Sequence, residues 1–286
     1  MSERSVASRP RGSSRKALRI KRSVAALIVL VAAAIGIDYG AAAITESVVA
    51  REMRTQLALA DDPSVRINNF PFLTQAISGK YRSIDVVADH MAIGPLRDVQ
   101  VRSQLRDVAA PLSQMLEGPR TVTVREVEGT ARIGAPDVER LISNSSGIAV
   151  DKVYIDRIDA DGLERAVDED GADPALLKLD PANAVRLGGT VDVLGQEQQV
   201  AIIAELQLAD GRAQITPRDV RLGDSDADPL PVALQRTLSR IFTLTLDPGS
   251  LPLQVTPTTL RATSGGLEIS GLTGRLVLGA GAPTSS

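Results

Sequence analysis

The 286-residue sequence contains no cysteine, no tryptophan and a single histidine. The absence of cysteine excludes disulfide bonds, a thiolate nucleophile, cysteine-ligated zinc and the lipid-attachment cysteine of a lipoprotein. A serine–histidine–acid triad would have to be built on His90. The chain also lacks a G-x-S-x-G elbow, a phosphate-binding loop and a dinucleotide fingerprint. We therefore expect neither an enzyme nor a protein with a metal centre or a bound cofactor.

Aromatic residues are scarce as well, at 2% of the chain. Hydrophobic residues make up 43% and charged residues 23%, which are ordinary values for a globular protein. A core or a cavity must therefore be lined mainly by Val, Leu, Ile and Ala. The length is sufficient to bury a core in one large domain or two small ones.

Two local features resemble metal or catalytic sites but have a simpler structural explanation. His90 continues the alternation of apolar residues that begins at Ile84, so we expect a structural histidine and not a metal ligand or general base. Residues 157–168 resemble the spacing of an EF-hand loop, but Arg157 occupies the first position, where calcium requires a carboxylate. We expect a hairpin that turns at Asp161-Gly162 in its place.

Charge is divided unevenly along the chain. Residues 1–22 contain eight basic residues and one acidic residue, so the remainder of this chain of net charge −3 is acidic. An acidic body argues against nucleic acid as a partner. Residues 23–37 carry no charge, and a basic stretch before such an apolar segment is typical of an export signal. The basic side should stay in the cytoplasm, which places the rest of the chain in the cell envelope, on the extracytoplasmic side of the plasma membrane.

Two fates of the apolar segment remain open. Ala41 and Ala43 supply the small-x-small pattern of a signal-peptide cleavage site. Residues 23–43 are also long enough to span a bilayer as an uncleaved anchor, with Asp38 near the outer end, where a charge costs less than at the centre. The predicted organisation is a basic cytoplasmic region at 1–22, a signal anchor or signal peptide at 23–44, a single domain at 45–279 and a disordered tail at 280–286.

Hydrophobic periodicity alternates between helix and strand along the rest of the chain. Within residues 67–91, Leu73, Ala76 and Ile77 share one helical face. Gly79 then ends the helix, and strand-like alternation begins at Ile84. The same reasoning predicts helices at 45–60, 136–142 and 231–242, and strands at 99–105, 122–133, 200–208, 213–220 and 253–269. This pattern indicates an α+β fold with long curved antiparallel sheets wrapped around amphipathic helices.

Two runs of sequence carry a family resemblance. FPFLTQAISGKYRSIDV at residues 70–86 and LPLQVTPTTLRATSGGLEISG at residues 251–271 resemble the LmeA-like family of actinobacterial periplasmic phospholipid-binding proteins. The resemblance extends over about residues 45–279. It implies a tubular lipid-binding fold akin to the bactericidal permeability-increasing proteins, a phospholipid ligand, with the phosphatidylinositol type as one candidate, and a role in envelope mannolipid assembly.

The residues expected to bind lipid fall into two sets. An apolar cavity wall is predicted from Phe70, Phe72, Leu73, Ile77, Leu234, Leu238, Ile241 and Phe242, and a rim for an anionic headgroup from Arg97, Arg102 and Arg106. The function that follows is that of an exported, membrane-tethered protein that carries or presents phospholipid for cell-envelope assembly. The alternative is that the same apolar residues fill an ordinary core and the arginines are solvated. The protein would then be an envelope scaffold without a lipid ligand.

Overall fold

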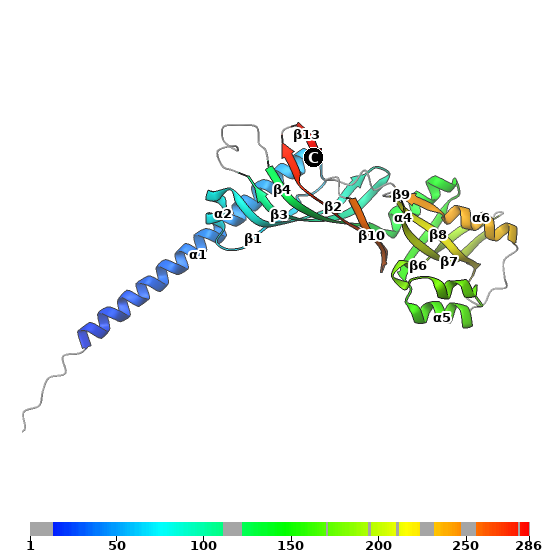
Figure 1. Ribbon diagram of the computed structural model, residues 1–286, viewed down its shortest axis with the longest axis horizontal. Helices are drawn as coiled ribbons and strands as arrows, with labels where there is room; N and C mark the ends of the chain where they lie inside the picture. Colours follow the sequence, from blue (N-terminus) through cyan, green and yellow to red (C-terminus); the bar gives the residue numbers. More distant parts are fainter. Residues whose placement is uncertain are drawn as a thin grey trace, which may run out of the picture.

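The computed structural model of the chain describes residues 14–110, 122–169, 171–193, 196–209, 212–223, 232–246, 256–279 and 281–285. A long N-terminal helix leads into a first curved sheet, and a second sheet with most of the shorter helices follows at the far end of the molecule (Figure 1). Both sheets are antiparallel throughout the described ranges. The predicted fold class, α+β with curved antiparallel sheets and amphipathic helices, is confirmed.

Helix α1 (Ser14–Leu57) is continuous through the predicted boundary between export segment and domain. Its residues 23–37 are exposed on all sides, whereas from Asp38 onward one side of the helix is shielded by the domain. The shielded positions follow the helical period and are mostly small: Ala41, Ala42, Thr45, Glu46, Val49, Ala50 and Met53. The helix predicted at 45–60 is therefore only the last part of a much longer one, because no residue between 23 and 45 stops it.

Helix α2 (Phe72–Ser78) lies beside α1 and ends as predicted. Gly79 has φ of 64° at its C-terminus, a left-handed conformation that glycine adopts without steric cost. Strand β2 (Lys80–Ile93) begins at the next residue. The change from helical to strand periodicity near Gly79 was therefore readable from the sequence.

The first sheet joins strands from both ends of the domain. Its order is β1-β2-β3-β4-β11-β10, and β12 pairs with the start of β4 and with β13. The strands are β1 (Ser64–Asn68), β3 (Leu96–Ala109), β4 (Val122–Gly134), β10 (Thr256–Thr263), β11 (Gly266–Thr273), β12 (Leu276–Gly279) and β13 (Gly281–Ser285). The tail predicted to be disordered thus contains a strand, because β12 offers β13 a hydrogen-bonding edge.

The second sheet has the order β5-β6-β7-β8-β9. Its strands are β5 (Val150–Arg157), β6 (Ala184–Val193), β7 (Gln196–Ala209), β8 (Arg212–Leu222) and β9 (Leu244–Leu246). Helices α4 (Ala135–Ser146) and α6 (Val232–Phe242) pack on one face, and their apolar residues join a core that continues into the first sheet. The largest core cluster thus spans both sheets, and two smaller clusters lie under α5 and around Val127 of the first sheet.

The opposite face of the second sheet is covered by α5 (Ala160–Asp168) and the short helices η1 (Pro174–Lys178) and η2 (Pro181–Asn183). The hairpin predicted at Asp161-Gly162 was wrong. The Asp159 carboxylate instead accepts a hydrogen bond from the amide of Gly162 at 2.8 Å and begins α5. An Asp-x-Asp-Gly run is compatible with a turn and with the start of a helix. Here the helix is favoured because Leu163 and Ala166 form an apolar face that is buried.

Candidate lipid-binding surfaces

The first sheet has one apolar and one polar face. Ile84, Leu105 and Val127 lie opposite one another on neighbouring strands. Side chains alternate between the faces of a sheet, so the next row, Asp85, Gln104 and Glu128, lies on the other side. Val127 is fully buried, and Ile84 and Leu105 are half-buried. Of the two faces of this sheet, the apolar one has side chains compatible with an acyl chain.

A row of small residues crosses the middle of the apolar face. Ser103, Gly129 and Gly271 are in register on β3, β4 and β11. Leu105 and Val127 lie on one side of this row. Val101, Ala131 and Ile269 lie on the other. Glycine in the interior of a strand often marks a place where another chain or a ligand approaches the backbone closely.

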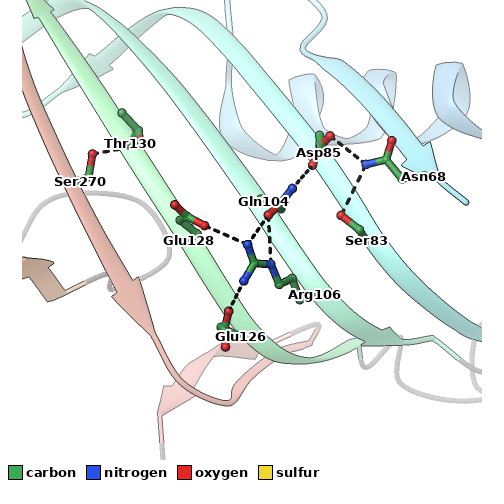
Figure 2. Close-up of polar contacts among 9 residues, drawn as sticks. All are labelled: Asn68, Ser83, Asp85, Gln104, Arg106, Glu126, Glu128, Thr130 and Ser270. Atoms are coloured by element: carbon green, nitrogen blue, oxygen red, sulfur yellow. Dashed lines mark hydrogen bonds and ion pairs between the residues drawn. The ribbon is translucent and has the colours of Figure 1, made fainter.

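The polar face of the same sheet holds a network of hydrogen bonds and ion pairs (Figure 2). Arg106 contacts Glu126 at 2.8 Å, Glu128 at 3.2 Å and the side-chain oxygen of Gln104 at 2.7 Å. The amide of Gln104 in turn donates to Asp85 at 3.2 Å. Charges of opposite sign on adjacent strands stabilise a solvated sheet face.

The arginines predicted to form a headgroup rim are divided between this face and one end of the sheet. Arg106 is already paired with two glutamates, and the exposed Arg102 lies on the same face, opposite Thr130. Arg97 is exposed at the start of β3, where its backbone amide donates to the buried Asp137 at 3.0 Å. Their role as a rim stays a prediction.

The residues predicted to form one cavity wall occupy two separate places. Leu234, Leu238, Ile241 and Phe242 are on α6, where the last three are buried in the core against the second sheet. Phe70, Phe72, Leu73 and Ile77 lie at α2, and Figure 1 shows α2 and α6 toward opposite ends of the molecule. The structure thus does not bring the two groups together, and the α6 group has the burial of an ordinary core.

The junction of α1 and α2 is organised by a buried carboxylate. Both oxygens of Asp38 accept a hydrogen bond, from the backbone amides of Phe72 and Leu73, each at 2.8 Å. These amides lie in the first turn of α2 and have no partner within that helix. Asp38 is only 5% exposed. A negative charge at this end of a helix is also favoured by the helix dipole.

Further contacts hold α2 in place. The ring of Tyr39 stacks on Phe70, with centroids 6.0 Å apart. The side-chain amide of Gln75 donates to the backbone oxygens of Asn68 and Asn69. Phe72 is buried near Tyr81, and burial raises the pKa of the Tyr81 phenol. With Phe72 buried and Gln75 bonded to the domain, α2 leaves the apolar side chains of Leu73 and Ile77 exposed.

A cavity of about 340 Å³ lies on the second sheet, beside α5. It is lined by Lys152, Tyr154, Arg186 and Arg221, among others. Arg221 pairs with Asp219 at 2.8 Å, whereas Lys152 and Arg186 make no ion pair with any residue that the structure describes. The lining therefore carries an excess of positive charge, which suits an anionic group such as a phosphate.

His90 lies at an exposed end of β2. Its Nδ1 is 2.7 Å from a carboxylate oxygen of Asp98. This hydrogen bond and the charge of Asp98 raise the pKa of His90 above its ordinary value of 6.5. Within the described ranges, no three histidine or carboxylate side chains come together as a metal site would require.

Comparison with known protein families identifies the chain. The model of the LmeA-like phospholipid-binding proteins matches residues 37–271. The chain belongs to the LmeA-like phospholipid-binding family. No curated protein matches the sequence. The LmeA-like match begins one residue before Asp38 and includes α2, the first sheet except β12, β13 and the end of β11, and the whole second sheet.

Sequence reasoning missed the role of Asp38. The signal was present, because a single carboxylate interrupts an otherwise apolar segment. Its partners lie 34 and 35 residues further along the chain, a separation that periodicity does not connect.

We expect Asp38→Ala to loosen α2. The substitution leaves the amides of Phe72 and Leu73 without acceptors, and each lost hydrogen bond to a charged group is worth about 1.5–3 kcal/mol. Hydrogen–deuterium exchange of residues 72–78 should become faster. Glu52→Ala, on an exposed part of α1, is the matched control and should leave this exchange unchanged. Equal protection of α2 in both variants would contradict the assigned role.

We also expect the single histidine to titrate above pH 6.5 in proton NMR spectra, and to return toward that value in Asp98→Asn. A raised pKa means that the folded state favours the protonated ring. The pair therefore stabilises the fold below about pH 6.5, and this contribution is lost as the pH rises through the raised pKa. Identical titration curves for the two proteins would refute the contact.

Proposed function

We propose that this protein binds a phospholipid through the apolar face of its first sheet and presents it at the extracytoplasmic surface of the plasma membrane for envelope assembly. The observation that carries the proposal is the match of residues 37–271 to the LmeA-like phospholipid-binding family. The apolar face, with its row of Ser103, Gly129 and Gly271, is the surface best suited to an acyl chain. Binding of this kind involves no chemical step.

The physical basis of affinity is the removal of acyl methylenes from water. Each buried methylene contributes about 0.8 kcal/mol, so a long chain can be held without a demanding polar site. The headgroup needs only a cation near the surface. Lys152 and Arg186 at the cavity of the second sheet are available for this role, while Arg102 and Arg106 lie on the polar face of the first sheet and Arg106 is engaged with two glutamates. A phosphatidylinositol-type headgroup would suit any of these cations.

We propose further that α1 is retained as a membrane anchor. Its part near the N-terminus is long and apolar enough to cross a bilayer and is almost entirely exposed. Cleavage after Ala43 would remove Asp38 and leave the first amides of α2 without acceptors. A cleaved signal peptide has no reason to make such contacts with the mature domain.

Retention of the anchor is checked by the intact mass of the protein from the membrane fraction of its native host. We expect a mass that includes residues 23–43. A mature N-terminus at or near Ile44, in a soluble fraction, would show that the segment is a signal peptide.

The binding surface is tested with a phospholipid that carries a photoreactive group near the end of one acyl chain. The full chain, in membranes containing this lipid, should cross-link through peptides of β2, β3 and β4. Gly129→Leu and Ser103→Leu place bulk on the apolar face, and we expect each to reduce the cross-linked fraction about tenfold.

The matched control is Thr130→Leu, which places the same side chain on the opposite face of β4. It should cross-link like the unaltered protein, and thermal unfolding establishes that all three variants are folded. Undiminished cross-linking of folded Gly129→Leu and Ser103→Leu would remove the apolar face from the proposal. An absence of cross-links in the unaltered protein would favour a scaffold without lipid.

A further inference from the structure

The structure points to a second contact between protein and membrane. We propose that Phe70 and α2 form a lipid-embedded face, which lies in the outer leaflet beside α1. This inference rests on the proposed anchoring by α1 and adds to it a fixed depth for the domain. The occupant of the face is the bilayer itself.

The first argument is length. The hydrocarbon core of a bilayer is about 30 Å thick and requires about 20 helical residues. The freely exposed segment at 23–37 supplies about 15 residues, or ~22 Å at 1.5 Å per residue. Arg22 precedes this segment and places its inner end at the cytoplasmic interface. The hydrocarbon must therefore extend past Asp38 to about residue 42, and α2 is attached at Asp38.

The second argument is that the protein itself satisfies the charge of Asp38. A carboxylate at this depth is expensive unless its oxygens are satisfied by protein groups. Both oxygens accept backbone amides of α2, and the residue is almost completely buried. Asp38 and the first turn of α2 thus satisfy each other at a level of the bilayer where water is scarce.

The third argument is the surface that α2 presents. Phe70 is 57% exposed, Leu73 37% and Ile77 81%. Residues 67–79 contain no charged side chain. On α1, Ile37, Tyr39 and Ile44 are exposed on either side of Asp38. Because the exposed surface of α1 at residues 23–37 is in lipid when α1 spans the membrane, an uncharged apolar face that begins where this segment ends is its continuation.

The residues that follow α2 fit the same arrangement. Lys80 and Arg82 are exposed at the start of β2, directly after Gly79. Long cationic side chains near a membrane interface extend their charge to the anionic headgroups. Among the polar residues of α2, Gln75 bonds to the backbone of Asn68 and Asn69. The exposed hydroxyls of Thr74 and Ser78 donate to backbone oxygens, those of Pro71 and Gln75. The uncharged α2 therefore lies on the side of the proposed membrane, and the cations that follow it lie at the interface.

The absence of cysteine from the chain allows a direct measurement of depth. Single cysteines are introduced as Ile77→Cys and Thr74→Cys on α2, and each full-length protein is nitroxide-labelled and reconstituted in vesicles of phosphatidylglycerol and phosphatidylethanolamine. Collision rates with oxygen, which concentrates in lipid, and with a water-soluble nickel complex then report the surroundings. Leu177→Cys on η1 is the matched control, because Leu177 is a large, 50% exposed apolar residue remote from α1. Leu30→Cys reports whether α1 itself lies in lipid.

We expect the Ile77 and Thr74 labels to be oxygen-accessible like the Leu30 label, with the ratio of oxygen to nickel collisions at least about tenfold above that of Leu177. Labels on α2 that match Leu177 while Leu30 is in lipid would overturn this inference and leave the anchor intact. A Leu30 label in water would overturn both the anchor and the inference.

Discussion

The Asp38 carboxylate connects the exposed apolar part of α1 to the folded domain. Hydrogen bonds to charged acceptors are among the stronger polar contacts in a protein, and their strength rises where water is excluded. Two of them fix α2 to α1 at the residue where α1 begins to contact the domain. Glu46 adds a third contact further along α1, accepting from the amide of Ile67 on β1 at 2.7 Å. A continuous helix with these contacts has no flexible linker between its exposed apolar part and the first sheet.

The polar network on one face of the first sheet makes that face unsuited to an acyl chain. Arg106, Glu126 and Glu128 satisfy one another in water, and removing them from water would cost more than their mutual attraction returns. The proposed acyl-chain site is therefore on the opposite face. That face is apolar, and Ser103, Gly129 and Gly271 form a row of small residues across three of its strands. The same alternation of side chains that makes one face soluble makes the other suitable for lipid.

Much of the local structure was predictable because it depends on neighbours in sequence. The end of α2 at Gly79, the hairpin of β7 and β8 and the apolar face of α6 all follow from periodicity and a turn residue. What periodicity cannot supply is the partner of an apolar face. Leu73 and Leu238 both stood at helical spacing, yet Leu73 lies at the junction with α1, where its amide bonds to Asp38, and Leu238 lies in the core of the second sheet. The pairing of β12 with the start of β4 likewise depends on contacts far apart in the chain.

The rigidity of the anchor bears on what kind of lipid handling is physically open to the protein. A domain on a long flexible tether could move a lipid away from the membrane, whereas a domain continuous with its anchor remains at one depth. As the proposed anchor, the 44-residue α1 would hold the first sheet at the membrane surface, since its shielded side packs on α2 and β1 from Asp38 onward. With the bilayer as one neighbour, the exchange of an acyl chain between leaflet and apolar face requires only a short path through water. The proposed anchoring therefore favours the proposed role, in which lipid is presented at the same surface, over one in which lipid is carried away from the membrane.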